Sequence, residues 1–283
     1  MAESRMADVG GLRMHYLIEG EGPLVMLVHG WPQTSHCWRH LIGPLAEHFT
    51  VVAPDLRGYG RTDKPLTGFD KRTMASDVRE LARQLGHERL TLVGHDRGAR
   101  VAHRYALDHP DEVERLVVMD IIPTREMWRR FDMDSGIALG TWHWTFHLQP
   151  DLPERLAGAD VRGYLGYFFE KWTVQRAALD AEEYYRAFSQ PGALRAGFDD
   201  YRASFPDDAA HDDDADYDAG RRLEMPVLAL WGEAGLPARV GVEEVWRDYA
   251  HDVRGAEIPD CGHFLAEERP DLVLDHLRDF FKL

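Results

Sequence analysis

The stretch that decides the fold reads Leu90-Thr91-Leu92-Val93-Gly94-His95-Asp96-Arg97-Gly98-Ala99-Arg100. Four apolar or β-favouring residues lead into the pattern Gly-x-Asp-x-Gly, and a helix-compatible segment, Ala99–Leu107, follows. The order predicts a buried strand, a tight turn and a helix. Steric constraints explain why Gly94 and Gly98 stand on either side of Asp96. The turn strains the backbone of its central residue, and side chains two positions away would collide with the neighbouring strand and helix.

A strand, a sharp turn and a helix with a reactive residue at the turn resemble the nucleophile elbow of the alpha/beta-hydrolase fold. Most members of that fold carry Ser where this chain has Asp96. A carboxylate with an ordinary pKa of about 3.9 is ionised at neutral pH. It can therefore displace a leaving group from a saturated carbon without a base. The alternative is an Asp that caps the following helix, but the two glycines favour the nucleophile.

Strand and helix patterns alternate along much of the chain. Residues 13–18 alternate like an edge strand, and continuous apolar runs predict strands that are buried on both faces. Leu24–Val28 is such a run. Further strands are predicted from Thr50, at Arg115–Met119, at Val227–Trp231 and at Glu257–Pro259. Helical periodicity appears in Met74–Leu85 and Pro270–Phe281. The alternation predicts an α/β fold with a mostly parallel sheet flanked by helices.

The pattern changes after Ile122-Pro123. From Thr124 to about Arg222 the chain is aromatic, helical and acidic, without a run typical of a parallel strand. We therefore predict that residues 1–123 and 223–283 form the alpha/beta-hydrolase core and that residues 124–222 form an inserted helical cap. Within the cap, the acidic segment Asp207–Asp218 contains few apolar residues and predicts a solvated loop.

The order Asp96, Asp120, His263 fits a nucleophile, an acid and a base at the carboxyl ends of successive strands. His263 lies in a Gly-His-Phe turn after the last strand, where this fold places its base. Many hydrolases carry the acid after the next strand along, but Gly235 stands where an Asp is often found. Asp120 is therefore the better candidate, with Glu233 as the fallback and helix capping as the alternative role of Asp120.

Two backbone N–H groups are expected to form an oxyanion hole. The loop His29-Gly30-Trp31-Pro32 follows a central strand, where such enzymes place one donor, here the N–H of Trp31. The second donor would be the N–H of Arg97, just after the nucleophile. We predict that His29 orients the loop rather than acting as a second base.

Three segments carry a closer family resemblance: Asp96-Arg97-Gly98-Ala99-Arg100, Trp142-His143-Trp144 and Asp200-Tyr201-Arg202-Ala203. Together they closely resemble the fluoroacetate (haloacetate) dehalogenases, and the resemblance covers nearly the whole chain. Haloalkane dehalogenases and many epoxide hydrolases place Trp directly after the nucleophile instead. The resemblance implies hydrolytic dehalogenation of a short 2-haloacid, such as haloacetate, through an alkyl ester of the nucleophile.

The resemblance also implies residue roles. The nucleophile, the base and its acid partner would be Asp96, His263 and Asp120. The substrate carboxylate would be held by Arg97 and Arg100. The departing halide would accept hydrogen bonds from His143, Trp144 and Tyr201. These residue types suit the roles, because guanidinium groups bind carboxylates through paired charge-assisted bonds and fluoride needs several donors in a dry pocket. The alternatives are a surface ion pair for Arg100 and packing of the cap core for His143 and Trp144.

Two other functions stay open. An epoxide hydrolase shares the Asp nucleophile but needs cap acids, usually paired tyrosines. The candidates for such a pair are Tyr201 with Tyr164, Tyr167, Tyr184 or Tyr185. That function would leave the two arginines unexplained. A non-catalytic binding protein on the same fold is the other alternative, and the intact nucleophile, base and acid argue against it.

Composition limits the binding partners, the metal or disulfide sites and the cellular location that can be expected. A net charge of −16 argues against nucleic acid and anionic membranes as partners. Cys37 and Cys261 match neither a disulfide framework nor a metal site. Residues 1–10 hold no apolar signal core, and no run reaches transmembrane length. We therefore expect a cytoplasmic protein. The family resemblance implies a small anionic haloacid substrate and no metal or organic cofactor, and it suggests a homodimer.

Overall fold

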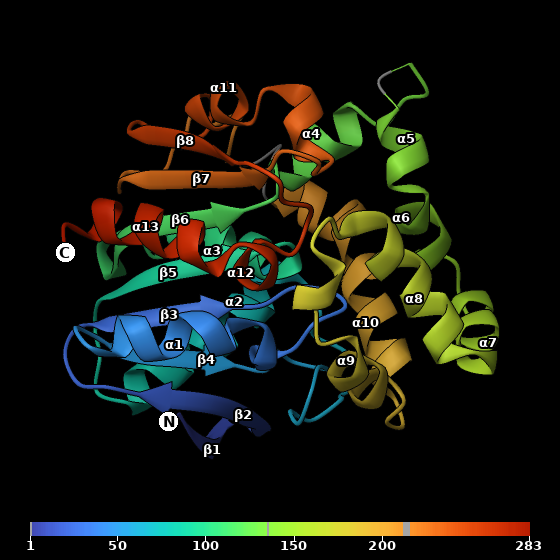
Figure 1. Ribbon diagram of the computed structural model, residues 1–283, viewed down its shortest axis with the longest axis horizontal. Helices are drawn as coiled ribbons and strands as arrows, with labels where there is room; N and C mark the ends of the chain where they lie inside the picture. The colour runs from blue at the N-terminus through green and yellow to red at the C-terminus, as the bar shows by residue number, and fades with distance from the viewer. Residues whose placement is uncertain (1, 135, 212–215) are drawn as a thin grey trace.

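The computed structural model describes residues 2–134, 136–211 and 216–283, which build one eight-stranded sheet in the order β1-β2-β4-β3-β5-β6-β7-β8 (Figure 1). The strands are β1 Glu3–Val9, β2 Leu12–Glu19, β3 Leu24–Val28, β4 Thr50–Pro54, β5 Leu90–His95, β6 Val113–Met119, β7 Val227–Gly232 and β8 Val253–Ile258. β2 pairs antiparallel with β1 and β4, and every other pair of neighbours is parallel. The predicted mostly parallel sheet is confirmed.

Helices cover both faces of this sheet. In Figure 1, α1 and α13 lie in front of it, whereas α2 and α3 lie behind it. The flanking helices are α1 Arg39–Ala46, α2 Lys71–Gln84, α3 Arg97–Asp108, α11 Val242–Arg247, α12 Leu265–Glu268 and α13 Pro270–Phe281. All residues of β3 and β5 are buried, as their continuous apolar runs predict for strands covered on both faces.

The turn between β5 and α3 has the strained geometry that its glycines predict. Asp96 adopts φ 47° and ψ −122°, which is rare for a residue with a side chain. A Cβ added at Gly94 would lie 2.5 Å from the Cα of Ala99, and one at Gly98 would lie 2.2 Å from the carbonyl oxygen of His29. Both glycines are therefore needed for strand β5, helix α3 and the end of β3 to approach so closely.

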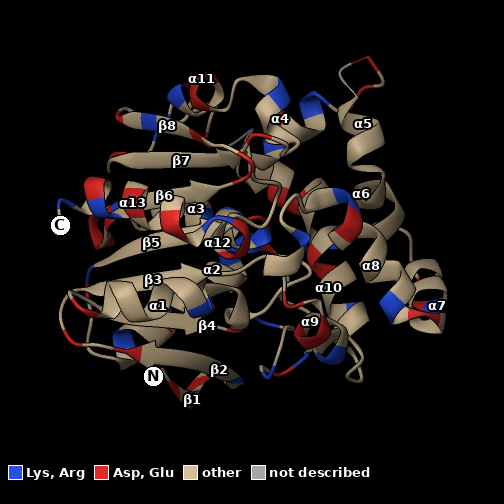
Figure 2. Ribbon diagram, viewed as in Figure 1, with Lys and Arg blue, Asp and Glu red and all other residues tan. Residues whose placement is uncertain are grey.

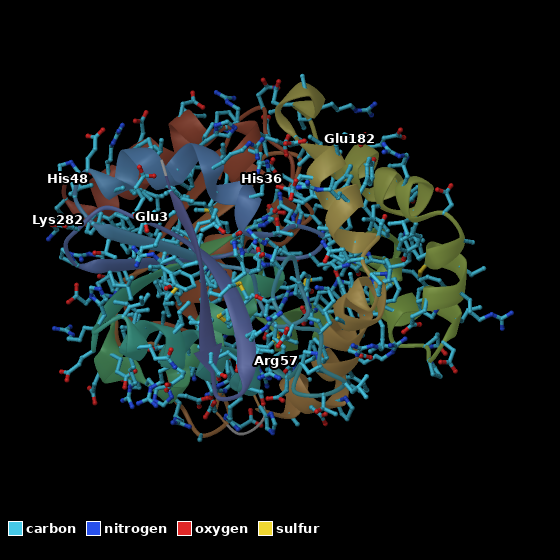
Figure 3. The ribbon with its side chains drawn as sticks, turned by 90° about the horizontal axis from the view of Figure 1, so that it is seen from below. Glu3, His36, His48, Arg57, Glu182 and Lys282 are labelled. Atoms are coloured by element: carbon cyan, nitrogen blue, oxygen red, sulfur yellow. The ribbon has the colours of Figure 1, made fainter. Side chains whose placement is uncertain are left out.

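A group of helices stands beyond the end of the sheet where β5 runs into α3 (Figure 1). They are α4 Thr124–Arg129, α5 Ile137–Gly140, α6 Trp142–His147, α7 Leu152–Ala159, α8 Val161–Trp172, α9 Ala181–Phe188 and α10 Ala193–Ala203. Figure 3, seen from below, has Glu182 of α9 at this end and His48 and Lys282 at the opposite end. We refer to these helices as the cap; its exact limits at residues 123 and 223 stay a prediction.

The structure differs from the sequence prediction at the first strand. The predicted edge strand corresponds to β2, but β1 lies outside it and forms the edge. Only Val9 of β1 is buried, so the segment lacks the alternation of buried and exposed residues by which strands are recognised.

Within the described residues, no helix combines the length and the apolar composition needed to cross a membrane.

The acidic segment of the cap also differs from its prediction. Asp208 and Asp216 are buried rather than solvated. Asp208 lies against Lys71, and Asp216 pairs with Arg104 at 2.7 Å. The solvated-loop prediction is wrong at these two positions because distant cations, invisible in the local pattern, pair with the carboxylates. Residues 212–215 of the same segment lie outside the described residues.

Candidate active site

Three side chains meet where the parallel strands end. Asp96 comes from the turn after β5, Asp120 follows β6 and His263 follows β8. His263 Nδ1 lies 2.6 Å from Asp120 Oδ2. His263 Nε2 faces Asp96 Oδ2 at 3.9 Å, which is beyond hydrogen-bonding distance. The structure therefore brings the predicted nucleophile, acid and base together, with the base directed toward the nucleophile.

The carboxylate of Asp120 occupies the space next to Gly235. A Cβ at Gly235 would lie only 2.3 Å from Asp120 Oδ1, and the same oxygen accepts the backbone N–H of Gly232 at 3.1 Å. The fallback acid, Glu233, is exposed and accepts the backbone N–H of Asp260. Of the two candidate acids, only Asp120 contacts His263, and the glycine at 235 makes room for it.

The electrostatics of the site favour an ionised nucleophile and a basic imidazole. Burial alone would lower the pKa of His263, but the hydrogen bond and charge of Asp120, with the charge of Asp96, raise it above its ordinary value. Burial likewise opposes ionisation of Asp96, yet the nearby His263 and Arg97 lower the pKa of its carboxyl. Asp96 is therefore anionic at neutral pH without help from a base.

One predicted oxyanion donor contacts the nucleophile directly. The backbone N–H of Trp31 donates to Asp96 Oδ1 at 2.8 Å. This approach needs Gly30, because a Cβ there would lie 2.5 Å from the same oxygen. His29 is buried and holds the loop: its Nε2 accepts the N–H of Leu56 at 3.0 Å, so its Nδ1 donates to the carbonyl of Gly30. The imidazole of His29 thus orients the loop that carries the donor.

A cavity of about 350 Å³ opens above Asp96. Its wall includes His263, Asp120, Arg100, His143 and Trp144, which come from both the sheet and the cap. Toward the solvent it is lined by exposed side chains, among them Leu139, Trp142, Tyr167, Lys171 and Arg239. The nucleophile is therefore reached through a pocket that carries three cationic side chains.

The two predicted carboxylate ligands have different surroundings. Arg100 lines the cavity, with its Nη1 donating to the carbonyl of Ile122 at 3.1 Å and to Thr124 Oγ1 at 3.0 Å. Arg97 is fully buried and is not among the lining residues. Its Nε and Nη2 donate to Asp200 Oδ1, and Nη2 also donates to Ser204 Oγ. Its Nη1 is buried and has no hydrogen-bond partner among the described residues.

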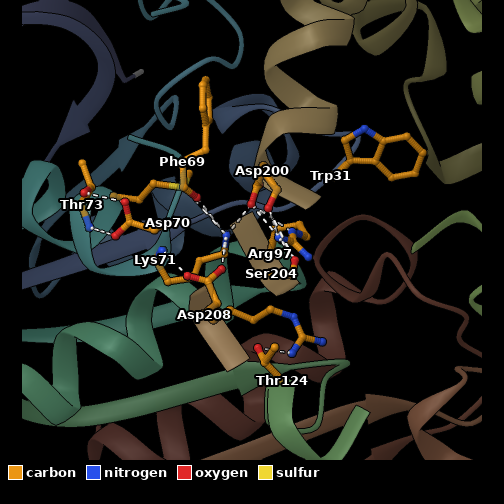
Figure 4. A network of polar contacts seen from close by, with 12 residues as sticks. Trp31, Phe69, Asp70, Lys71, Thr73, Arg97, Thr124, Asp200, Ser204 and Asp208 are labelled. Carbon is orange, nitrogen blue, oxygen red and sulfur yellow. Dashed lines mark hydrogen bonds and ion pairs between the residues drawn. The ribbon is translucent and has the colours of Figure 1, made fainter. Parts of the chain in front are cut away.

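Asp200, which the sequence analysis did not single out as a charged group, is the centre of a buried ionic network (Figure 4). Besides Arg97, its carboxylate contacts the ammonium group of Lys71 and accepts the hydroxyl of Tyr59 at 2.6 Å. Lys71 also lies 3.4 Å from Asp208. Burial opposes ionisation, but Arg97 and Lys71 hold the pKa of Asp200 well below its ordinary value. The network ties the cap helix α10 to α2 and α3.

The three predicted halide donors form one aromatic group in the cap. His143 and Trp144 line the cavity, whereas Tyr201 is not among its lining residues. The Tyr201 ring packs against His143 at 5.6 Å and Trp144 at 5.9 Å, and the Arg97 guanidinium lies 4.2 Å from its centre. Burial lowers the pKa of His143 to about 3, so its imidazole is neutral, and raises the pKa of Tyr201, so its hydroxyl keeps its proton.

No cluster of three or more His, Cys, Asp or Glu side chains within the described residues has the arrangement of a metal site. The arrangement is that of a carboxylate nucleophile with an imidazole base and a backbone oxyanion donor. Residues 23–270 match the family model described as the alpha/beta hydrolase fold. The chain belongs to the alpha/beta hydrolase family.

Two curated members of this alpha/beta hydrolase family are 40% identical to the chain. One is a soluble epoxide hydrolase from Corynebacterium sp. (strain C12), aligned over 282 residues that cover 97% of this chain and 96% of the relative. The other is a fluoroacetate dehalogenase from Burkholderia sp., aligned over 289 residues that cover 98% and 93%. Equal identity to both leaves the choice of substrate to the chemistry of the site.

Solved alpha/beta hydrolase-fold structures agree with this assignment. ALR0039 from Nostoc sp. PCC 7120 superposes with a TM-score of 0.94 and 42% identity, covering 99% of this chain and 98% of that one. The epoxide hydrolase CorEH without ligand gives a TM-score of 0.89 and 37% identity, covering 100% and 99%. The predicted alpha/beta-hydrolase fold is confirmed.

Proposed function

We propose that this hydrolase cleaves the carbon–halogen bond of short 2-haloacids, such as haloacetate, to give the 2-hydroxy acid and halide. The observation that carries the proposal is the cationic surrounding of the nucleophile in a strongly acidic chain. Arg100 lines the cavity beside Asp96. Arg97 lies behind the cavity wall, but its charge also acts on Asp96, and its buried Nη1 has no hydrogen-bond partner among the described residues. Two guanidinium groups near Asp96 suit the binding of a substrate that carries a carboxylate.

In the first half-reaction, Oδ2 of Asp96 attacks the carbon that carries the halogen. A new C–O bond forms as the carbon–halogen bond breaks, and the halide leaves with the bonding electron pair. Neutral His143, the indole N–H of Trp144 and the hydroxyl of Tyr201 would donate hydrogen bonds to the halide. The product is an ester between Asp96 and the 2-carbon of the acid.

In the second half-reaction, water attacks the carbonyl carbon of that ester. Nε2 of His263 accepts the proton of the water, and Asp120 at 2.6 Å stabilises the resulting imidazolium. Negative charge develops on Oδ1, which already accepts the N–H of Trp31. The intermediate collapses by releasing the hydroxy acid, whose new hydroxyl takes the proton back from His263.

The second candidate is epoxide hydrolysis, because the Corynebacterium relative at 40% identity carries that name. It uses the same Asp nucleophile but needs an acid to protonate the opened oxygen. Two of the tyrosines considered for that role are engaged elsewhere: Tyr164 bonds to His147, and Tyr184 bonds to Glu267. Tyr167 lines the cavity. The haloacid is favoured because epoxides carry no charge for Arg100 to bind.

The deciding experiment compares the two substrates with one enzyme preparation. Halide release from chloroacetate and fluoroacetate is measured beside diol formation from styrene oxide, with Asp96→Ala as the control. We expect halide from both acids, no diol, and loss of halide release in the variant. Diol formation without halide release would identify an epoxide hydrolase, and neither product would favour a non-catalytic binding protein.

A further inference from the structure

Glu268, at the end of α12 and five residues after His263, is a buried carboxylate surrounded by backbone donors. One of its oxygens accepts the N–H groups of Val174 at 2.7 Å, Gln175 at 2.9 Å and Gly262 at 3.1 Å. Its other oxygen accepts the N–H of Phe264 at 3.0 Å. Four backbone donors thus converge on one side chain that takes no part in the triad.

These bonds hold the base from both sides. Gly262 and Phe264 are the two chain neighbours of His263, so Glu268 holds the backbone N–H groups on either side of it. The backbone of His263 is held as well: its N–H donates to the carbonyl of Trp172 at 2.7 Å, and its carbonyl oxygen lies 2.7 Å from His95 Nε2. The whole turn that carries the imidazole is therefore fixed relative to β5 and the end of α8.

Only a carboxylate suits this position. An ionised Glu has two acceptor oxygens and no donor, whereas Gln would direct an NH₂ group at backbone N–H groups. The turn also needs Gly262, because a Cβ there would lie 2.1 Å from the carbonyl oxygen of Trp172 and 2.9 Å from Glu268 Oε1. The close packing of turn, cap and carboxylate is built for a negative charge at Glu268.

We infer that Glu268 is a positioning residue for His263, and that it sets the rate of ester hydrolysis by holding the imidazole in line with the attacking water. The inference rests on the proposed ester of Asp96, which dehalogenation and epoxide opening share. It leaves the first half-reaction unaffected, because Asp96 attacks without a base.

The buried charge also favours the imidazolium form of the base. The charged groups that face His263 are Asp120, Asp96 and Glu268, and all three raise the pKa of His263 against the effect of burial. The imidazoles of His95, 4.6 Å away between ring centres, and His143 face it too, and burial lowers the pKa of each to about 3. Neutralising Glu268 should therefore lower the pKa of His263.

Glu267→Gln is a matched control for Glu268→Gln. Glu267 is the adjacent buried carboxylate on the same short helix, but it accepts bonds from Tyr184 at 2.7 Å and contacts Gln33 and Arg39 instead of the His263 turn. Both variants exchange a buried carboxylate for an amide of the same shape. A general loss of stability should appear in both variants, whereas a change in the position or pKa of His263 should appear in Glu268→Gln alone.

The first measurement needs no substrate. NMR of protein labelled in histidine, with the His263 signal assigned by its absence in His263→Asn, follows the titration of His263. We expect a lower His263 pKa in Glu268→Gln and an unchanged one in Glu267→Gln. An unchanged His263 signal and titration in folded Glu268→Gln would overturn the inference, whichever substrate the enzyme uses.

The second measurement follows one turnover with chloroacetate by rapid quenching and intact-protein mass spectrometry. In Glu268→Gln, halide should appear at the wild-type rate, while hydrolysis of the Asp96 ester slows on the order of 10- to 100-fold, the cost of misplacing a catalytic group. The ester should then accumulate, as it should not in Glu267→Gln. Ester hydrolysis at the wild-type rate would overturn the inference.

If Glu268→Gln does not fold, Glu268→Asp replaces it. This variant keeps the charge but shortens the side chain, so we expect a near-wild-type His263 pKa with slowed ester hydrolysis; wild-type hydrolysis would overturn the positioning role. Failure of the proposed function looks different. Wild-type enzyme would then form no Asp96 ester from chloroacetate or styrene oxide, while the His263 titration would still test Glu268.

Discussion

Asp96 presents its two carboxylate oxygens to different neighbours. Oδ1 accepts the N–H of Trp31 at 2.8 Å, whereas Oδ2 faces Nε2 of His263 at 3.9 Å. Oδ2 is therefore the oxygen available to attack carbon. When the ester is hydrolysed, the negative charge falls on Oδ1, where a donor is already in place. In the proposed reaction, this one side chain would therefore serve both half-reactions.

The two arginines near Asp96 should act on carboxylate substrates in particular. We predict that Arg100→Met lowers kcat/KM for chloroacetate. The fall should correspond to a loss of about 2–4 kcal/mol of transition-state stabilisation, because the substitution removes a charged partner from a desolvated site. Steady-state kinetics of halide release check this value. Arg97→Met should cost at least as much, since it also leaves Asp200 with one cation fewer.

Chloroacetamide is the matched control substrate, because it replaces only the carboxylate. Wild-type enzyme should turn it over far more slowly than chloroacetate, and Arg100→Met should narrow that difference. Equal rates on the amide and the acid in the unmutated enzyme would show that these arginines do not recognise the carboxylate.

At the residue scale, local sequence predicts the reactive groups better than their supports. Asp96 and His263 stand in turns with a recognisable glycine pattern, and Gly235 in place of an acid directs attention to Asp120. The partner of Arg97 is Asp200, 103 positions away, and no local pattern joins them. Glu268 escapes notice for a similar reason, since its task is to accept backbone N–H groups and any residue type can supply those.

Helices α2, α3 and α10 are joined by charges rather than by apolar contact alone. Lys71 opens α2, Arg97 opens α3, and both meet Asp200 of α10 with no exposure to solvent. Figure 4 shows Lys71 between Asp200 and Asp208, with Arg97 and Ser204 on the other side of Asp200. Removing one member leaves its partners charged and buried, which is costly.

We therefore predict that Lys71→Met destabilises the protein by about 3–5 kcal/mol, the range for breaking a buried ion pair from one side. Urea unfolding followed by circular dichroism measures the loss. The control is Arg162→Gln, which breaks an exposed pair with Glu182 and should cost far less, because solvent-exposed ion pairs contribute little to stability. Equal losses in the two variants would mean that the network does not hold the cap helix to α2 and α3.

At the element scale, the success of sequence analysis follows burial. Strands β3 and β5 are buried along their whole length, so their apolar runs are unambiguous. β1 is almost fully exposed and β8 has one buried residue, so the sequence pattern does not predict β1 and predicts only the end of β8. The solvated-loop prediction for the acidic segment is wrong for the opposite reason. Asp208 and Asp216 are buried, but their polar sequence pattern predicts exposure because the cations that pair with them lie far away in the chain.

The whole molecule is acidic, yet its active-site pocket is not. The chain carries a net charge of −16, and the ribbon in Figure 2 has Asp and Glu residues in both the sheet region and the cap. Lys171 and Arg239 are exposed and line the outer part of the cavity, with Arg100 further in. Such local cations offset the repulsion that an anionic substrate meets at long range.

Steering by these cations predicts a salt-dependent rate. Lys171→Gln with Arg239→Gln should lower kcat/KM for chloroacetate about tenfold at low ionic strength. The difference should shrink in 0.5 M salt, where screening acts within about 5 Å. The control pair, Arg162→Gln with Lys282→Gln, changes the net charge equally at exposed positions that do not line the cavity. The same loss in both pairs would attribute the effect to total charge rather than to the pocket.

The central claim is that Asp96 forms an ester with the substrate and that water then attacks the carbonyl carbon of this ester. A single turnover of excess wild-type enzyme with chloroacetate in heavy-oxygen water tests it most directly. Peptide mass spectrometry should find the heavy oxygen in Asp96, and the first glycolate released should carry none, because its hydroxyl oxygen comes from the carboxylate. Heavy oxygen in the first glycolate, with none in Asp96, would mean that water attacks the substrate carbon itself and would contradict the assignment of Asp96 as the nucleophile.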